Sequence, residues 1–419
     1  MMADPNPWSM IPFALLLGAM ALAPVFTPRR WAQHYAKVAL GLGAVTLGYY
    51  LFRLGDRVTV WQTTHEYLSF IALVGSLFVV SGGIHIGVKG RATPLGNVAF
   101  LLGGALTANL LGTTGAAMLL IRPWIRLNQG RVAAHHIVFF IFIVANVGGC
   151  LTPIGDPPLF LGYLKGVPFW WVLEHCWPMW AVGTGGLLVI FYGLDRRNHR
   201  QARPAGPAPV APGEGWKFDG RFNLVFLAII LVAVFVERPL FLREGLMLAA
   251  ALGSWLTTKK TVHAANDFNF HPLLEVVILF AGIFATMMPA LAWLNQHATI
   301  LLGQQAAPAM FYWSTGALSA GLDNAPTYLG FLSALHNVTG TSDLPSLLES
   351  HARHVVAISI GAVFFGAATY IGNGPNFMVK SLAEQNGVRM PTFLEFVVKY
   401  TLPGLLPVLV TVWLLFFRD

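Results

Sequence analysis

The chain alternates long apolar segments with short polar gaps. Each apolar segment is close to the length of a membrane-spanning helix, about 20 residues. In the first half this pattern predicts helices over residues 9–26, 38–52, 67–88, 94–121, 137–164 and 171–194. In the second half it predicts helices over residues 221–236, 240–257, 273–294, 309–336, 355–382 and 393–417. A polar stretch rich in Arg, Pro, Ala and Gly separates the halves, so we divide the chain into a first transmembrane repeat (1–194), a linker (195–220) and a second repeat (221–419).

Segment 94–121 is too long for one neat crossing, and it decides the topology. The polar residues Thr107, Asn109, Thr113 and Thr114 interrupt its centre. Basic residues flank both of its ends, namely Lys89 and Arg91 before it and Arg122, Arg126 and Arg131 after it. A re-entrant hairpin with its tip near Asn109 would place both basic groups on one membrane face. The alternative is twelve simple crossings.

With the hairpin, most Lys and Arg residues fall on one face, as the positive-inside rule requires. The linker, with Arg196, Arg197 and Arg200, lies on that face. The loops around residues 309–336 contain one Arg and no Lys, as external loops should. We therefore expect a multi-pass protein of the cell inner membrane with both termini outside.

Two polar motifs recur in both halves. Thr152-Pro-Ile-Gly-Asp-Pro-Pro-Leu-Phe160 and Thr369-Tyr-Ile-Gly-Asn-Gly-Pro-Asn-Phe377 share five of nine residues at an offset of 217, which pairs Asp156 with Asn373. Asn109 and Asn324 recur at an offset of 215. With five crossings and one hairpin in each half, the second copy enters the membrane from the opposite face. The predicted fold is thus an all-α polytopic membrane protein of two inverted-topology repeats, each with a re-entrant hairpin and a broken helix.

The breaks carry the candidate chemistry. Proline and glycine interrupt the helices there, and unpaired backbone at that depth is tolerated only around a cavity or inside protein. Asp156 and Asp323 are acids within strongly apolar sequence, where an ionisable group is usually functional. Burial favours the protonated form of a carboxyl group, so such a pair can hold either protons or a cation such as Na⁺. The alternative is that each Asp caps a helix. The neutral ligands expected beside them are Asn109, Asn324, Asn373, Thr107, Thr152, Thr327 and Thr369.

Other polar residues within the spans are weaker candidates. Glu66 and Glu275 begin corresponding spans and lie either at the membrane interface or on a proton route. His135 and His136 lie at a predicted span end.

Composition agrees with a membrane protein. Of the 419 residues, 56% are hydrophobic and 11% are charged, against about 25% charged in soluble proteins. The mean hydropathy is +0.63. These values exclude a soluble enzyme, a disordered chain and a nucleic-acid-binding domain. The net charge of +8 therefore indicates membrane orientation, and two Cys residues give no disulfide framework.

The motifs resemble the ion transporter superfamily, which includes sodium/proton antiporters, arsenite permeases, citrate transporters and dicarboxylate transporters. The motifs concerned are Thr107-Ala-Asn-Leu-Leu-Gly-Thr-Thr-Gly-Ala, Asn146-Val-Gly-Gly-Cys-Leu-Thr-Pro-Ile-Gly-Asp-Pro-Pro, Gly321-Leu-Asp-Asn-Ala-Pro-Thr and Thr369-Tyr-Ile-Gly-Asn-Gly-Pro-Asn. The nearest likeness is to the citrate transporter and sodium:proton antiporter branch. The resemblance implies inverted repeats and a homodimer. It also implies binding roles for Asn109, Thr152, Asp156, Asp323, Asn324, Thr369 and Asn373.

The hairpin tips depart from the dicarboxylate branch, where both read Ser-Asn-Thr. Here they read Thr-Ala-Asn and Leu-Asp-Asn, and the acid of the second tip would repel a free carboxylate. We therefore expect a sodium/proton antiporter that uses no cofactor beyond the transported Na⁺ and H⁺. A citrate or metal–citrate symporter is the alternative, and arsenite efflux is a third. An intramembrane aspartyl protease does not fit, because Pro153 and Leu322 replace residues that its two motifs require.

Overall fold

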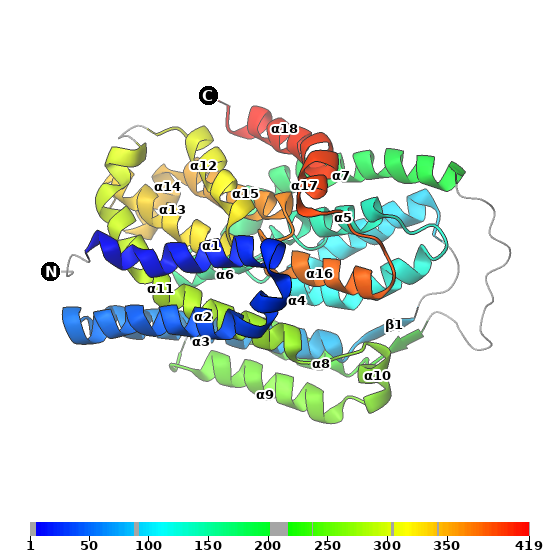
Figure 1. Ribbon diagram of the computed structural model, residues 1–419, viewed down its shortest axis with the longest axis horizontal. Helices are drawn as coiled ribbons and strands as arrows, with labels where there is room; N and C mark the ends of the chain where they lie inside the picture. Colours follow the sequence, from blue (N-terminus) through cyan, green and yellow to red (C-terminus); the bar gives the residue numbers. More distant parts are fainter. Residues whose placement is uncertain are drawn as a thin grey trace.

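The computed structural model consists mainly of helices that run along one long axis (Figure 1). It describes residues 6–87, 92–201, 217–236, 238–302, 306–341 and 343–418, so Lys89, Arg91 and most of the expected linker lie outside the described residues. By length and composition, seven of the described helices could cross a membrane, or eight if the bent pair Leu344–Ser350 and Ala352–Ala368 is one span. The seven include Pro94–Leu127, which folds back on itself as described below. The chain is therefore an all-α polytopic membrane protein.

The first half ends in a helix that continues beyond the predicted span into the expected linker. Its elements are η1 (Pro7–Met10), α1 (Ile11–Phe26), α2 (Pro28–Gly48), η2 (Tyr49–Leu54), α3 (Arg57–Gly82), β1 (His85–Gly87), α4 (Pro94–Leu127), α5 (Ala134–Ile143), η3 (Val147–Gly149), α6 (Pro157–Leu164) and α7 (Phe169–Gln201). The end of the molecule where α7 stops is called the linker end below.

The second half starts with a short strand that pairs with β1. Its elements are β2 (Lys217–Asp219), α8 (Asn223–Ala233), α9 (Leu242–Thr257), α10 (Lys260–Ala265), α11 (His271–Leu302), α12 (Pro308–Gly321), α13 (Asn324–Thr339), α14 (Leu344–Ser350), α15 (Ala352–Phe365), η4 (Gly366–Ala368), α16 (Gly374–Gln385), α17 (Phe393–Phe396), η5 (Val397–Leu405) and α18 (Leu406–Phe416). β1 and β2 are antiparallel, with His85 opposite Asp219.

α4 folds back on itself. Its backbone leaves the helical conformation at Gly112 (φ 70°, ψ 158°), a region that favours glycine. The Ala92 amide donates to the Leu127 carbonyl at 3.0 Å, so the two ends of α4 lie side by side. The chain thus turns at Gly112, three residues after Asn109, because a glycine can adopt this backbone conformation without strain.

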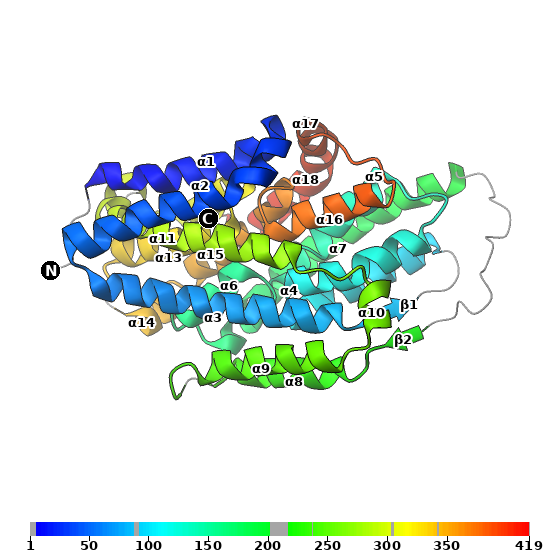
Figure 2. The ribbon, with the colours of Figure 1, turned by 60° about the horizontal axis from the view of Figure 1, so that its bottom comes forward.

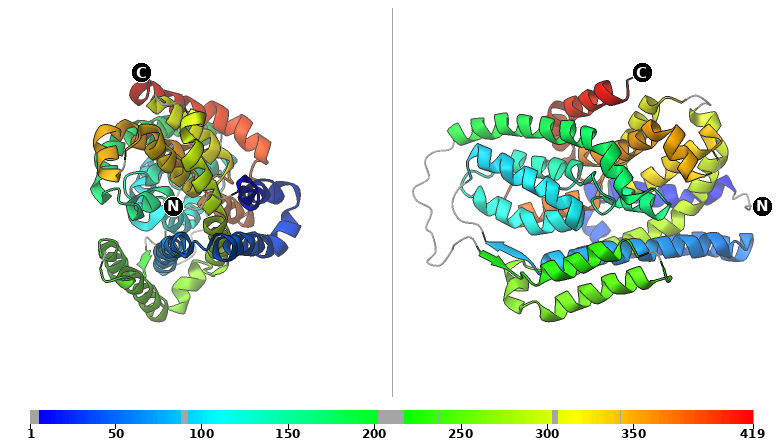
Figure 3. Two further views of the ribbon diagram at one scale, coloured as in Figure 1. Left: turned by 90° about the vertical axis from the view of Figure 1, so that its left-hand side faces the viewer. Right: turned by 180° about the vertical axis from the view of Figure 1, so that it is seen from behind.

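The second hairpin consists of α12 and α13, with its turn at Leu322 and Asp323. Phe311 near the start of α12 packs on Phe331 of α13, with ring centroids 6.4 Å apart. The first hairpin lies toward the linker end and the second toward the opposite end (Figures 1 and 3). This is the placement expected of two repeats that enter a membrane from opposite faces.

The helices form two groups. One, called the outer bundle, contains α1, α2, α3, α8, α9 and α11, and the other, called the core bundle, contains both hairpins, the broken helices, α7 and α18 (Figure 3, left). In Figure 2, α8 and α9 lie beside α3 along the lower edge of the molecule. The groups meet where α3 packs on α4 and α11 packs on α13. Within the core bundle the halves interlock, because α13 packs on α6 and α16 packs on α4.

The hairpin form of α4 predicts a labelling pattern. Exposed positions before and after α4, changed as Thr93→Cys and Gln129→Cys, should react with an impermeant maleimide from the same membrane face. Ser346→Cys in α14 should react from the other face. The native Cys150 and Cys176 are buried and should not react with the maleimide. Reaction of the two α4 positions from opposite faces would mean that α4 crosses the membrane once.

Candidate functional site

Two helices break at matching places. α5 ends at Ile143, and the chain is irregular or 3₁₀ until α6 begins at Pro157. α15 ends at Phe365, and α16 begins at Gly374. Pro153 and Pro157 prevent a continuous helix at the first break. Asp156 and Asn373 are the N-cap residues of α6 and α16, and both have extended backbones (φ −140°, ψ 145° and φ −154°, ψ 140°).

The Asp156 carboxylate lies where the hairpin tips meet the breaks, and its residue is 1% exposed. One oxygen, Oδ1, accepts from the Thr113 hydroxyl at 2.7 Å and from the Asn373 amide at 3.1 Å. The other oxygen, Oδ2, accepts from the Asn324 amide at 2.6 Å. Within the part of the chain that the structure describes, Asp156 forms no ion pair with a cationic side chain. Neutral donors from both halves therefore satisfy this acid.

A chain of buried amides extends from Asp156 into the second break. The Asn373 amide also donates to Asn146 Oδ1 at 3.1 Å. Asn146 donates to Asn376 Oδ1 at 2.6 Å, and Asn376 donates to the carbonyls of Gly366 and Thr369 at 2.8 and 2.9 Å. These contacts join the two broken helices side by side.

Sequence reasoning did not select Thr113, Asn146 or Asn376 as site residues. Each is a polar residue at a break or tip of an otherwise apolar segment, and this position is the sequence feature that could have identified it as a site residue. Spacing alone did not show which of the several polar residues near each tip face the acid.

One buried acceptor at the site has no donor. Asn324 is fully buried, and its Oδ1 has no hydrogen-bond partner among the described residues. An orphaned acceptor of this kind is unfavourable by about 1–3 kcal/mol. A cation or a protonated carboxyl group beside Asp156 would satisfy it.

Three of the predicted ligands support the backbone of the breaks instead of contacting Asp156. Asn109 accepts from the Leu151 amide at 2.8 Å and donates to the Gly148 carbonyl at 2.7 Å. The Thr152 hydroxyl donates to the Asn109 carbonyl at 2.7 Å. In the second half the Thr369 hydroxyl donates to a hairpin carbonyl at 2.8 Å in the same way. These residues hold each break against its own hairpin.

The carbonyl that Thr369 contacts belongs to Ala320, so the contacts pair Asn109 with Ala320 rather than with Asn324. In this register Asn324 corresponds to Thr113, and both residues donate to Asp156. The pairing of Asn109 with Asn324 by sequence offset is therefore four residues out of register. The sequence offset pairs Asn109 with Asn324 because both are Asn, but the equivalent tip residues that donate to Asp156 are Thr113 and Asn324.

Asp323 lies next to Asn324 but lines a different cavity from Asp156. Its carboxylate accepts from the Ala325 amide at 3.1 Å and caps α13, and the Thr327 hydroxyl donates to the Asp323 carbonyl at 3.0 Å. No hydrogen bond joins the carboxylates of Asp156 and Asp323. Thr107 bonds to the Gly103 carbonyl of its own helix at 2.7 Å, and no contact to the site residues is present. The pair of acids therefore flanks Asn324 and does not form a dyad.

Each acid lines its own cavity, and the cavities adjoin. A cavity of about 20 Å³ lies beside Asp156. A larger cavity, about 440 Å³, has Asp323 and Asn373 in its wall and extends along α11 and α16 to Arg122 and Asp267. Phe70, Val74, Thr114 and Pro157 line both. Asp267 is 81% exposed at its side chain and pairs with Arg122 at 3.6 Å. The large cavity thus leads from the site toward the linker end.

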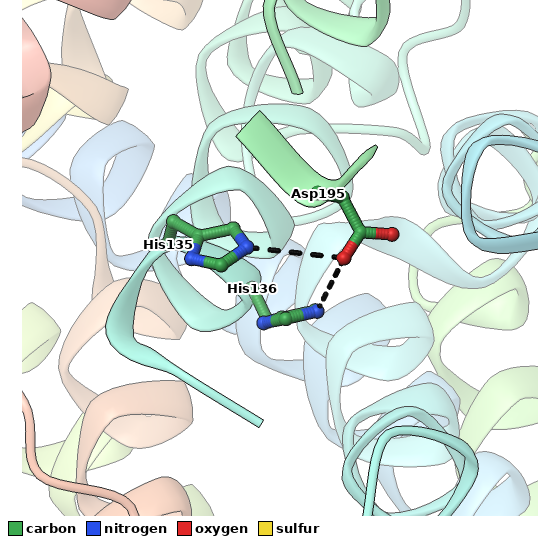
Figure 4. A group of neighbouring side chains, drawn as sticks. All are labelled: His135, His136 and Asp195. Atoms are coloured by element: carbon green, nitrogen blue, oxygen red, sulfur yellow. Dashed lines mark hydrogen bonds and ion pairs between the residues drawn. The ribbon is translucent and has the colours of Figure 1, made fainter. Parts of the chain in front are cut away.

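A separate polar cluster lies at the base of the first hairpin (Figure 4). His136 and His135 approach Asp195 Oδ1 at 3.0 and 3.9 Å. Arg131 also pairs with this oxygen, and the Asn97 amide donates to Oδ2 at 2.8 Å. A guanidinium on the same carboxylate repels a metal cation, so the cluster fastens α4 and α5 to α7 rather than holding a metal.

Buried acid and amide side chains at paired helix breaks are typical of secondary transporters, and the comparisons with known proteins agree. Residues 2–417 match the family described as "Putative citrate transport", and the chain belongs to that family. It is 26% identical over 316 residues to a "46 kDa membrane protein" of Mycobacterium leprae, covering 70% of each chain. It is 24% identical over 384 residues to an uncharacterized transporter of Mycobacterium tuberculosis strain H37Rv, covering 84% of this chain and 86% of the relative. The protein is a multi-pass membrane transporter.

The amide chain predicts a stability effect. Asn146→Ala should lower the free energy of unfolding by about 2 kcal/mol, because it leaves the buried Asn376 Oδ1 without its donor and removes one acceptor of the Asn373 amide. Thermal unfolding of the purified protein in detergent measures this as a lower midpoint. Gln129→Ala, at an exposed position, is the control. An unchanged midpoint for Asn146→Ala would contradict the coupling of the two breaks.

The hairpin-base cluster makes a second prediction. Arg131→Ala should destabilise the protein by about 3–5 kcal/mol, because it removes the guanidinium that pairs with the buried Asp195 carboxylate. The double variant Arg131→Ala/Asp195→Asn should recover part of this loss in the same unfolding assay. Stabilisation of the parent by added Zn²⁺, with loss of that effect in Asp195→Asn, would instead indicate a metal site.

Proposed function

We propose that the protein is a sodium/proton antiporter whose ion-carrying group is the Asp156 carboxylate. The observation that carries this proposal is that, among the described residues, a fully buried carboxylate is held by neutral donors alone, from both halves of the chain. A buried carboxylate without a fixed counter-charge needs a proton or a cation to neutralise it. The two occupants exclude each other, and this competition couples their movements in opposite directions.

The neutral side chains around Asp156 suit both occupants. With the acid ionised, the hydroxyl of Thr113 and the amides of Asn324 and Asn373 stabilise it by donating. Rotation of an Asn side-chain amide presents its oxygen, and Na⁺ binds oxygen ligands. The unpartnered Asn324 Oδ1 already provides one such oxygen beside the carboxylate.

Asp323 provides the approach to this site. It lies in the wall of the large cavity, next to the residue that bonds to Asp156. The cavity leads to the linker end, which the basic residues predict to be cytoplasmic. Movement of the core bundle against the outer bundle would then expose the site alternately to the two sides of the cell inner membrane. In this proposal the transporter works as a homodimer and needs no cofactor.

A second candidate is uptake of citrate, free or as a metal complex. A cavity of about 440 Å³ is far larger than a monovalent cation needs, and the Arg122 guanidinium in its wall can bind a carboxylate. The family's description points the same way. The acids Asp267, Glu275 and Asp323 in the same cavity favour a citrate that carries its own cation.

Flux through proteoliposomes separates these candidates. In the parent protein, Na⁺ pulses should dissipate an imposed pH gradient. Asp156→Asn should abolish this exchange, because the neutral amide can neither release a proton nor neutralise Na⁺. Asp323→Asn should slow exchange and weaken the apparent affinity for Na⁺. Asp219→Asn, an exposed matched substitution on β2, should behave like the parent.

The same proteoliposome assay can also refute the antiport proposal. If Na⁺ pulses leave the pH gradient intact while the vesicles accumulate citrate, the antiport proposal is wrong and the second candidate stands.

A further inference from the structure

Glu275 lies on the cavity-facing stripe of α11. His271, Glu275 and Leu279 follow each other at a spacing of four residues, which places them on one helix face, and all three line the large cavity. The helix is strongly apolar, with a mean hydropathy of 2.1 over its spanning part. Glu275 lies about 6 Å deeper than His271 along the helix axis. It therefore lies between the cavity's outer edge at Asp267 and the binding site.

Glu275 has no hydrogen bond or ion pair with any residue that the structure describes. Two other acids of the outer bundle have partners: Glu244 bonds to Ser69 and Arg243, and Glu66 pairs with Lys165. An ionisable residue in a spanning helix is unfavourable unless paired or functional. The missing partner and the cavity together indicate that Glu275 interacts with something that passes through the cavity.

The groups around Glu275 leave its carboxylate available. Two titratable side chains interact electrostatically with Glu275: Tyr35 of α2 and His271, one turn earlier on α11. The other charged or titratable groups of the cavity wall are Arg122, Asp267, Asp323 and Tyr370. Arg122 is already paired with Asp267. Since α11 belongs to the outer bundle, Glu275 and the core-bundle acid Asp323 line the cavity from different groups of helices.

We propose that Glu275 is the proton-relay residue of this transporter, which carries protons between the linker-end mouth of the cavity and the site beside Asp323. This inference rests on the proposed antiport. When Na⁺ enters the site, the proton that leaves the Asp156 carboxyl group passes through the adjoining cavities to the Glu275 carboxylate and then to water at the mouth. When Na⁺ leaves the site toward the mouth, a proton is taken up along the same route in the opposite direction, and no other reactant is needed.

The test compares Glu275→Gln with the parent in the proteoliposome exchange assay. A positioned proton acceptor contributes roughly 100-fold or more to a proton transfer, so the exchange rate should fall at least about tenfold. The apparent affinity for Na⁺ should change much less. Azide or formate, small weak acids that enter the cavity, should restore the rate in Glu275→Gln. Glu275→Asp should keep most of the activity, and Glu174→Gln, exposed on α7, should match the parent.

Three results would overturn the relay. One is a rate for Glu275→Gln equal to that of the parent, and another is a slow variant that weak acids do not rescue. If Glu275→Gln does not fold, carbodiimide labelling of the parent replaces it: a free carboxyl group at Glu275 should be modified, and modification should block exchange. Exchange that persists with Glu275 modified is the third. Absence of any Na⁺/H⁺ exchange in the parent is a different result, since it refutes the antiport proposal itself.

Discussion

The hydrogen bonds to the Asp156 carboxylate are the interaction on which the core bundle depends. They come from a hairpin tip of the first half, a hairpin tip of the second half and the second helix break, in Thr113, Asn324 and Asn373. A carboxylate in this position is tolerated only because donors from every side replace the water it has lost. Any change in its charge state alters contacts in both halves together.

The breaks and hairpins make such a site possible. Two helices stop near their middle, two hairpins reach them from opposite ends, and the Thr152 and Thr369 hydroxyls tie each break to its own hairpin. Interlocking of the halves through α6 with α13 and α4 with α16 then makes the core bundle one body. Contacts between the core and outer bundles surround the cavity, so relative movement of the bundles would change access to the site.

Much of this arrangement can be predicted from the sequence. The helices and the breaks follow from apolar length and proline positions, and the burial of Asp156 follows from its place in apolar sequence. The tip register and the roles of Asn109, Thr152 and Thr107 do not, because they depend on which side of a helix faces the break. Spacing along the chain does not show that the Thr107 hydroxyl bonds to a carbonyl of its own helix. For the same reason Asn146 and Asn376 become evident only when the two breaks are seen side by side.

The most direct test of the central claim is the number of protons released when Na⁺ binds to the purified protein in weakly buffered detergent solution. If Asp156 exchanges one occupant for the other, addition of Na⁺ to the parent at a pH where the acid is protonated releases protons, and Asp156→Asn releases none. Proton release from Asp156→Asn equal to that of the parent, or Na⁺ binding to the parent without any release, would contradict the account.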